Sequence, residues 1–161
     1  MKPLEHLRQL KLAKTKEMYP NVPDIALPKI EYNDRSANGL TTCIKDFLIF
    51  SGHHAERINT MGTPRDQRKT VTDVIGRRKT IGSIVWTKGT GTKGSADIHS
   101  EINVTINGQR IPIAVKWEVK IGKDRQSKDQ KEYESKVGNY FIVKSFDDFY
   151  EKYTEFLSKY L

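Results

Sequence analysis

Residues 94–120 read GSADIHSEINVTINGQRIPIAVKWEVK, and this stretch decides the fold. At its centre, Asn107-Gly108 is a strong hairpin signal, and apolar residues alternate with polar ones on both sides of it. The pattern predicts two antiparallel strands, over residues 95–106 and 109–121. Side chains alternate between the two faces of a strand. The face of the second strand that is suited to burial therefore carries Ile111, Ile113, Val115, Trp117 and Val119.

The opposite face of the hairpin gathers the side chains that carry chemistry. Lys116, Glu118 and Lys120 share it on the second strand, and Asp97 shares it on the first. Carboxylate oxygens suit Mg²⁺ or Mn²⁺, which keep several waters and also bind phosphate oxygens. A lysine beside the metal can orient the attacking water or stabilise the charge that develops at phosphorus. We therefore predict a metal-dependent phosphodiesterase site at Asp97, Glu118 and Lys120. The carbonyl of Val119 is a further candidate metal ligand.

The rest of the chain predicts an α/β fold around this hairpin. Helices are expected at residues 3–18, 38–51, 127–137 and 146–161, and further strands at 54–60 and 140–144. The core order is helix, three-strand meander, helix, strand, and a C-terminal helix follows it. Residues 1–35 form an N-terminal helix and a proline-containing arm. The domain proper then occupies residues 36–161.

A basic insertion interrupts this domain at about residues 61–93. From Arg57 to Lys93 the chain has nine Lys or Arg against two Asp, and its formal net charge is +8. Residues 70–75 and 80–86 could be two β segments around the glycine at 76, and a loop ordered only by its ligand is the alternative. The excess charge suits a polyanion such as DNA. The residues that we expect to contact the nucleic acid are Arg57, Arg77, Arg78, Lys79, Lys88, Lys93 and Lys116.

Three stretches, GSAD at 94–97, WEVK at 117–120 and RQSKDQKEY at 125–133, together resemble the VRR-NUC branch of the PD-(D/E)XK nuclease superfamily. The resemblance runs from about residue 38 to the C-terminus. It implies a restriction-endonuclease-like core and a Mg²⁺- or Mn²⁺-dependent deoxyribonuclease, a hydrolase of phosphodiester bonds. It also implies that Asp97 and Glu118 are metal ligands and that Lys120 is the catalytic lysine. Gln130 would then face the site from the following helix.

The sequence departs from that family on the first core helix. Many members have a glutamate there that points into the site, whereas SANGLTTCIKDF offers only Asn38 and Thr41. A nucleic-acid-binding module on the same fold, with catalysis lost, is therefore the alternative function. For Asp97, Glu118 and Lys120 the structural alternative is a cross-strand ion pair on an exposed sheet face.

The composition limits the setting and the partners. No apolar run approaches the roughly 18 residues that span a bilayer, and the N-terminal stretch lacks the apolar core of a secretory signal. The single cysteine, Cys43, cannot form an intramolecular disulfide. We expect a cytoplasmic protein that binds DNA and has no membrane partner. Single-stranded, duplex, and branched or flapped DNA are all open as the substrate. The sequence does not fix the oligomeric state; a homodimer is suggested only by analogy, because a branched substrate would favour two subunits.

Overall fold

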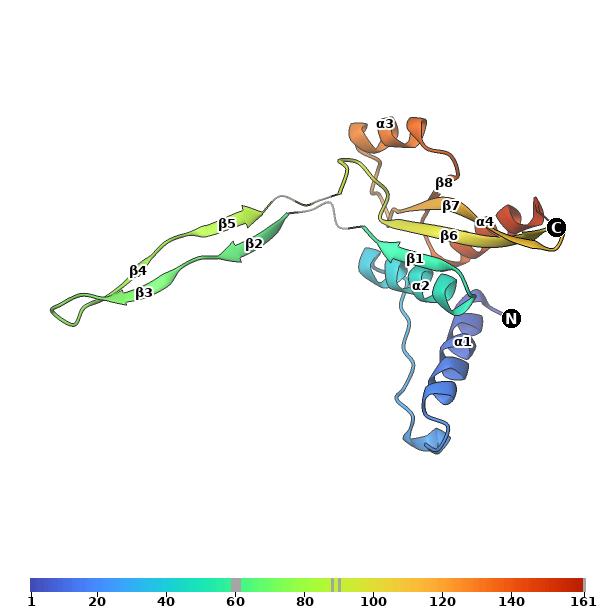
Figure 1. Cartoon of the computed structure of the whole chain (residues 1–161), viewed down its shortest axis with the longest axis horizontal. Coiled ribbons are helices and arrows are strands. Elements are labelled where there is room, and N and C mark those ends of the chain that lie inside the picture. The colour runs from blue at the N-terminus through green and yellow to red at the C-terminus, as the bar shows by residue number, and fades with distance from the viewer. Residues whose placement is uncertain (59–61, 88, 90, 161) are drawn as a thin grey trace. The chain divides into compact units, whose positions relative to one another are not determined.

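The computed structural model describes residues 1–58, 62–87, 89 and 91–160, and the chain divides into two compact units. The first unit comprises Met1–Ile58 and Gly94–Leu161, and the second comprises Asn59–Lys93. The described residues of the first unit form an α/β structure, as the sequence predicts, with four α-helices around a four-stranded mixed sheet (Figure 1). Its elements are α1 (Pro3–Met18), a 3-10 turn (Asp24–Ala26), α2 (Ala37–Phe50), β1 (His54–Arg57), β6 (Ile98–Ile106), β7 (Gln109–Val119), α3 (Lys128–Lys136), β8 (Tyr140–Val143) and α4 (Phe146–Ser158).

The sheet has the strand order β1-β6-β7-β8. β1, β6 and β7 pair antiparallel, and β8 returns parallel to β7 after the α3 crossover. The β6–β7 hairpin turns at Asn107 and Gly108, whose φ angles of 51° and 77° are the left-handed values that such a two-residue turn requires. The hairpin prediction is therefore confirmed. The turn also fixes the register, in which Ile98 pairs with Trp117.

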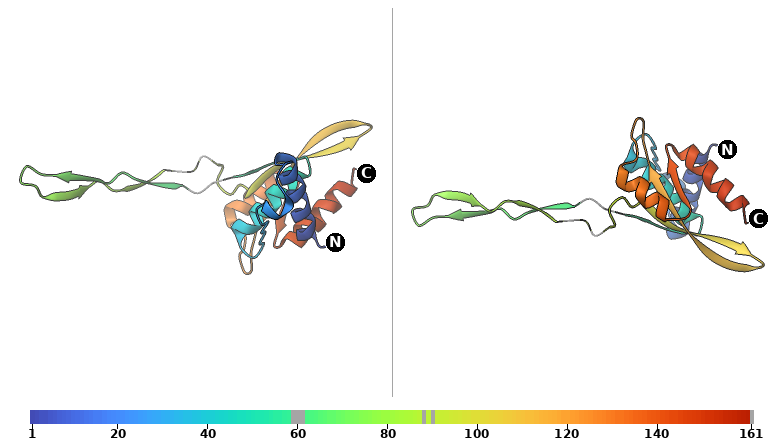
Figure 2. Two further views of the ribbon diagram at one scale, coloured as in Figure 1. Left: turned by 90° about the horizontal axis from the view of Figure 1, so that it is seen from below. Right: turned by 90° about the horizontal axis from the view of Figure 1, so that it is seen from above.

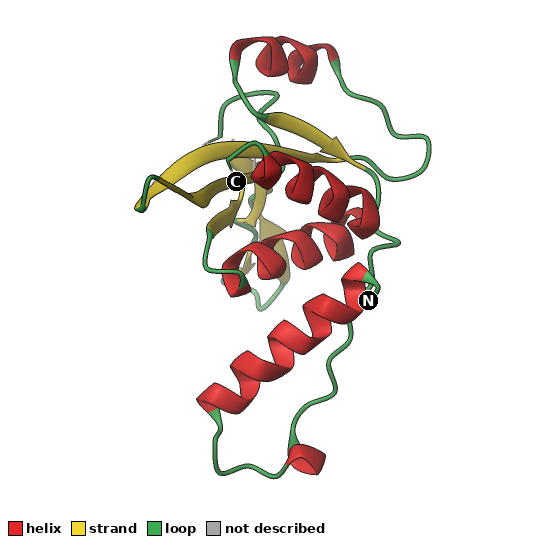
Figure 3. Cartoon of the chain, turned by 90° about the vertical axis from the view of Figure 1, so that its right-hand side faces the viewer, coloured by secondary structure: helices red, strands yellow, loops and turns green. Residues whose placement is uncertain are grey.

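Helices lie on both sides of this sheet, with α2 and α4 on one side and α3 on the other (Figure 3). The side of α2 and α4 is the hydrophobic core. There the ring of Trp117 lies 4.8 Å from that of Phe149, which in turn lies 5.8 Å from that of Phe47. Val115 and Val119 are buried with Trp117, as the alternation predicts. The other face of β7 is thereby left to the polar side chains beneath α3.

Burial does not extend along the whole of β7, and here one prediction is wrong. Ile111, expected on the buried face, is 38% exposed. The end of the hairpin that carries the turn projects past the helices in both views of Figure 2, so no core residue covers it. The buried part of the strand begins at Val115 and runs to its end. Burial therefore coincides with the part of β7 that carries the predicted site.

The N-terminal helix α1 packs against the other helices of the first unit. Leu7 of α1 is fully buried, and the ring of His6 lies 5.7 Å from that of Phe47 on α2. α1 contacts both α2 and α4. Its leucines at helical spacing are therefore explained by contacts within this chain.

Side-chain caps start three of the helices. Ser36, Ser127 and Ser145 each accept a hydrogen bond from the backbone N–H three residues further along. The end of α3 differs from the prediction, because Gly138 does not take the left-handed conformation of a terminating glycine. Asn139 takes it instead, with φ 48°, and asparagine is one of the few residues that tolerate it. Among the described residues, no helix is both long enough and apolar enough to cross a membrane.

His53, in the turn between α2 and β1, is a half-buried link between the sheet and α4. Its Nδ1 accepts a hydrogen bond of 3.1 Å from the backbone N–H of Asn103, and its Nε2 lies 2.7 Å from the hydroxyl of Tyr153. The first bond assigns the proton of the neutral ring to Nε2, which donates to Tyr153. Burial, with a smaller contribution from the charge of Arg110, lowers the pKa of His53.

We expect this pKa to make the stability of the protein depend on pH. The unfolded chain takes up a proton on His53 near pH 6.5, whereas the folded chain takes it up only at lower pH. Stability is therefore full above pH 6.5 and falls as the pH drops towards the lowered pKa. Urea unfolding at pH 7.5 and 5.5 should show a smaller pH-dependent loss for His53→Gln than for wild type. His54→Gln, at the exposed neighbouring position, should behave as wild type; equal losses in all three proteins would contradict the assignment.

The described residues of the second unit form a two-stranded antiparallel ribbon (Figure 1). β2 (Thr63–Asp66) pairs with β5 (Ile84–Thr87), and β3 (Lys69–Thr72) pairs with β4 (Arg78–Ile81). A bond of 3.2 Å from the Gln67 N–H to the Ser83 carbonyl continues the pairing between them. The predicted β segments are shorter than expected: 70–75 ends at Thr72, where a turn begins, and 80–86 is divided around Gly82.

Candidate active site

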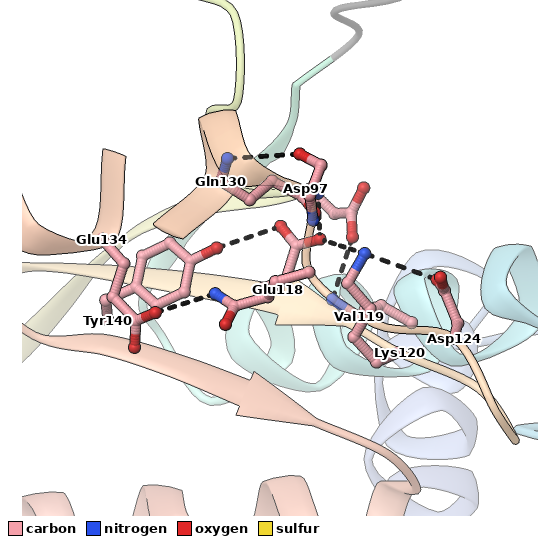
Figure 4. Close-up of polar contacts among 10 residues, drawn as sticks. Asp97, Glu118, Val119, Lys120, Asp124, Gln130, Glu134 and Tyr140 are labelled. Atoms are coloured by element: carbon pink, nitrogen blue, oxygen red, sulfur yellow. Dashed lines mark hydrogen bonds and ion pairs between the residues drawn. The ribbon is translucent and has the colours of Figure 1, made fainter. Parts of the chain in front are cut away.

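Asp97, next to the start of β6, lies opposite Glu118 on β7. Asp97 immediately precedes β6, and the register that pairs Ile98 with Trp117 sets it against Glu118 on the same face. Its Oδ2 accepts a hydrogen bond of 2.9 Å from the backbone N–H of Val119 (Figure 4). The two carboxyl groups are close enough that the charge of Asp97 helps to raise the pKa of Glu118. The structure therefore brings the two predicted metal ligands together.

Glu118 is only 1% exposed. Its Oε1 accepts a hydrogen bond from the Gln130 amide and lies 2.9 Å from the Lys120 ammonium, and its Oε2 accepts one of 3.3 Å from the Tyr140 hydroxyl (Figure 4). Burial is the main reason why the pKa of Glu118 is raised; Lys120 opposes the shift and Asp97 adds to it. Taking a lone carboxylate out of water is unfavourable by several kcal/mol. Here one cation and two neutral donors surround it.

Lys120 follows β7 directly, and its ammonium lies between two carboxylates. Nζ is 2.9 Å from Glu118 and 3.4 Å from Asp124. Burial acts to lower the pKa of Lys120, but the two carboxylates outweigh it and the pKa is raised. Lys120 is therefore a fixed positive charge at neutral pH. Its side chain is 9% exposed and that of Glu118 is 1% exposed, so the exposed sheet-face ion pair is excluded.

Gln130 joins the start of α3 to Glu118. Its backbone N–H donates to the Ser127 hydroxyl at 3.2 Å, and its side-chain oxygen accepts from the Ser127 backbone N–H at 2.9 Å, which together form a capping box. The remaining side-chain group, the amide Nε2, donates to Glu118. One residue therefore both begins the helix and contacts the buried carboxylate.

Gly94, the first residue of the GSAD stretch, lets the chain pass close to the start of α3. Its φ is +79°, and a Cβ at this position would overlap the backbone carbonyl of Asp129 and crowd the N–H of Gln130. Both the dihedral angle and the contact require glycine. The segment that leads to Asp97 is therefore held in close contact with the first turn of α3, which carries Gln130.

Two residues of the site were not predicted. Tyr140 begins β8, where the apolar run YFIV indicates only a buried strand; alternation along that strand could have set Tyr140 on the face of Glu118. Asp124 lies in the loop after Lys120, and no pattern in the sequence pointed to its ion pair. The polar residues around Glu118 and Lys120 therefore include Tyr140 and Asp124 in addition to the predicted Asp97.

The oxygen donors present fit a hard divalent cation that keeps part of its water shell. They are the carboxyl groups of Asp97 and Glu118 and the carbonyl of Val119, which lies on the same strand edge as the N–H bound to Asp97. No group of three or more His, Cys, Asp or Glu in the described part of the chain is arranged to hold a metal. Mg²⁺ commonly binds through one or two carboxylates and several waters. These donors therefore match Mg²⁺ or Mn²⁺ and not a structural zinc site.

The first core helix adds no carboxylate to this site. Thr41 is buried, and its hydroxyl donates to the carbonyl of Ala37. Asn38 accepts a hydrogen bond of 2.7 Å from the Arg57 guanidinium. Among the described residues, no hydrogen bond links Asn38 or Thr41 to Asp97. α2 therefore differs from the pattern of the VRR-NUC branch in its sequence and also in the contacts that Asn38 and Thr41 make.

The residues expected to contact nucleic acid fall into separate groups. Arg57 lies on β1, and Lys116 lies on the face of Glu118, where burial lowers its pKa. The remaining ones are in the second unit: Arg77, Arg78 and Lys79 lie at or next to its turn, and Lys93 is its last residue, while Lys88 is outside the described residues. The structure therefore groups the catalytic candidates within the first unit, and it groups Arg77, Arg78 and Lys79 within the second.

No protein-family model matches this chain, and neither a curated protein nor a solved structure matches it. The function must therefore be inferred from the residues themselves. They form a site in which two carboxyl groups from adjacent segments of the sheet meet one lysine and one helix-capping glutamine, with Glu118 and Lys120 buried.

Proposed function

We propose that this protein is a metal-dependent nuclease that hydrolyses phosphodiester bonds in DNA. The observation that carries the proposal is the carboxyl pair of Asp97 and Glu118 with the ammonium of Lys120 2.9 Å from Glu118. A purely structural ion pair gains nothing from a second carboxyl group, since the charge of Asp97 disfavours ionised Glu118. Such unfavourable neighbours are typical of functional sites, where a bound cation compensates them.

The order of the elements supports membership of the PD-(D/E)XK superfamily. α2, the β1-β6-β7 meander, α3 and parallel β8 follow one another as the resemblance to the VRR-NUC branch implies for a restriction-endonuclease-like core. The capping box at Ser127 and Gln130 coincides with the Ser-x-x-Gln of that resemblance. The fold alone does not determine chemistry, so the proposal depends on the site and uses the topology as support.

In the proposed reaction, Asp97, Glu118 and the Val119 carbonyl would hold the metal. Mg²⁺ or Mn²⁺, when bound, supplies a water of lowered pKa and screens the charge of the phosphate. Lys120 keeps its proton and stabilises the negative charge that develops on the phosphate oxygens. Gln130 and Tyr140 hold the carboxyl group of Glu118 in place with hydrogen bonds from neutral donors.

DNA is the proposed substrate because the chain carries 28 basic against 20 acidic residues. Each basic side chain that neutralises a phosphate releases counterions and favours binding. Branched or flapped DNA and a homodimer remain predictions of the sequence. The direct test is a cleavage screen of single-stranded, duplex, flapped and branched DNA with Mg²⁺, Mn²⁺ or EDTA. Cleavage of at least one substrate with metal and none in EDTA is expected; intact DNA throughout would refute the proposal.

Calorimetric titration with Mn²⁺ distinguishes a nuclease from a binding module that has lost catalysis. We expect wild type to bind Mn²⁺ and Glu118→Gln to bind it about tenfold more weakly or worse, because an anionic ligand has been removed. Glu101→Gln is the matched control, since Glu101 is exposed on the same hairpin and the charge change is identical. Equal binding by all three proteins would favour the binding module.

A further inference from the structure

Among the residues of the second unit that the structure describes, none forms a hydrophobic core. Every residue of β2, β3, β4 and β5 is exposed. A two-stranded hairpin without a packed face is only marginally stable in water. It also leaves large apolar side chains in water, among them Trp86 at 66% exposure and Ile75 at 76%. Apolar surface kept exposed in this way marks a surface that meets a partner.

The charge of the ribbon indicates what that partner is. The segment 59–93 has eight Lys or Arg and two Asp, so it holds six of the eight excess positive charges of the chain. Opposite residues of an antiparallel pair point to one face. Lys69, Val71 and Lys79 therefore share one face of the β3–β4 pair, and Thr72 and Arg78 share the other. Cations on both faces suit a partner that is anionic on two sides, as the phosphate walls of a DNA groove are.

The turn of the ribbon presents two apolar side chains on a fixed backbone. Asp73 closes the turn: its Oδ1 accepts hydrogen bonds from the N–H groups of Ile75 and Arg77, and its backbone N–H donates to the Arg77 carbonyl. Gly76 supplies the positive φ of 81°. Val74 and Ile75 project fully from this turn, with exposures of 104% and 76%. Proteins that bend DNA insert apolar wedges of this kind between base pairs.

We infer that the ribbon docks in a groove of duplex DNA, with Val74 and Ile75 as a wedge that bends the duplex. Arg77, Arg78 and Lys79 would contact phosphates next to the wedge. Two-stranded ribbons enter the minor groove as well as the major one, and the minor groove is the side from which apolar wedges enter the base stack. From Thr63 to Thr72 the ribbon is about 33 Å long at about 3.3 Å per residue, close to one turn of the double helix. The inference needs only the second unit, so it holds or fails whether or not the carboxyl site cleaves DNA.

The docking is tested with the full chain in EDTA, so that no cleavage interferes. Fluorescence anisotropy would measure binding to a 30-base-pair duplex over a range of KCl concentrations. Relative to wild type, Arg77→Ala/Arg78→Ala/Lys79→Ala should lower the slope of log K against log salt by about 3 and the affinity at 0.1 M KCl by about 100-fold. Lys2→Ala/Lys14→Ala/Lys29→Ala removes the same charge from exposed sites of the first unit and should change the slope by less than 1. Equal losses in the two triple variants would overturn the docking.

The wedge is tested by energy transfer between dyes at the two ends of the same duplex. Wild type should increase the transfer on binding, and Val74→Ser/Ile75→Ser should lose most of that increase while keeping the salt slope of wild type. No increase with wild type would overturn the wedge. Tighter binding through Arg77, Arg78 and Lys79 to a single-stranded 30-mer, or to phosphatidylserine vesicles, would overturn the duplex as the partner.

Discussion

Replacing Asp97 by Asn or Glu118 by Gln is expected to lower metal-dependent DNA cleavage by about 100-fold to 1000-fold. Both substitutions preserve the size of the side chain but remove the negative charge that would hold the cation and, through it, the attacking water. Loss of a single preorganised electrostatic group at a reacting centre commonly lowers kcat by about 10² to 10³. The measurement is the single-turnover rate in Mn²⁺ on the best substrate of the screen.

Glu101→Gln is again the matched control, because it changes one carboxylate of β6 at an exposed position. We expect it to cleave at the wild-type rate. Thermal melting of all variants verifies that the first unit stays folded. If Asp97→Asn and Glu118→Gln cleaved as fast as Glu101→Gln, the carboxyl pair would have no part in the reaction and the proposed function would be lost.

Gly94→Ala is expected to lower cleavage by about 100-fold. The added Cβ overlaps the backbone carbonyl of Asp129, and backbone cannot rotate away as a flexible side chain can. Relief requires a shift of the first turn of α3, which carries Gln130 away from Glu118. A displacement of about 1 Å at a reacting centre can cost 10²-fold in rate. The free energy of unfolding should change little by comparison with the cleavage rate, because none of the residues of α3 is buried.

Gly108→Ala separates the effect of the dihedral angle from that of the contact. Gly108 has φ +77°, nearly the value of Gly94, but its Cβ would meet nothing within 4 Å. We expect this variant to lose about 1–2 kcal/mol of unfolding free energy from the left-handed conformation and to retain wild-type cleavage. Gly138→Ala, in open space and without positive φ, should change neither quantity. Cleavage by Gly94→Ala at the rate of Gly108→Ala would show that the contact with α3 is unimportant.

The parts of the fold that follow from local rules could be predicted from sequence. Asn107-Gly108 specifies a turn with two positive φ angles, and strict alternation after it specifies which side chains of β7 share a face. From these rules alone, Asp97 and Glu118 fall on one face in register. Ser127 likewise marks the start of α3 within one residue.

Other features depend on distances that no local pattern encodes. Burial of β7 begins only at Val115, because it depends on how far α2 and α4 reach along the sheet. The alternation of apolar residues in the sequence extends back to Ile111, so it predicted a longer buried segment than the structure has. Asp124 meets Lys120 through a turn that contains Gly122 at positive φ, and a turn has no periodicity from which the contact could be predicted. The strands of the ribbon have no buried face, so the usual two-residue period of a half-buried strand was weak there.

Gln130 joins two equilibria that are usually independent. Its side-chain oxygen stabilises the first turn of α3, while its amide nitrogen engages the carboxylate of Glu118. By thermodynamic linkage, any ligand that draws Glu118 away from Gln130 changes the free energy of forming that turn, and fraying of the turn changes the affinity for the ligand equally. α3 has no buried residue to anchor it. The helical order of its first turn would therefore change most directly when a ligand binds the carboxylate of Glu118.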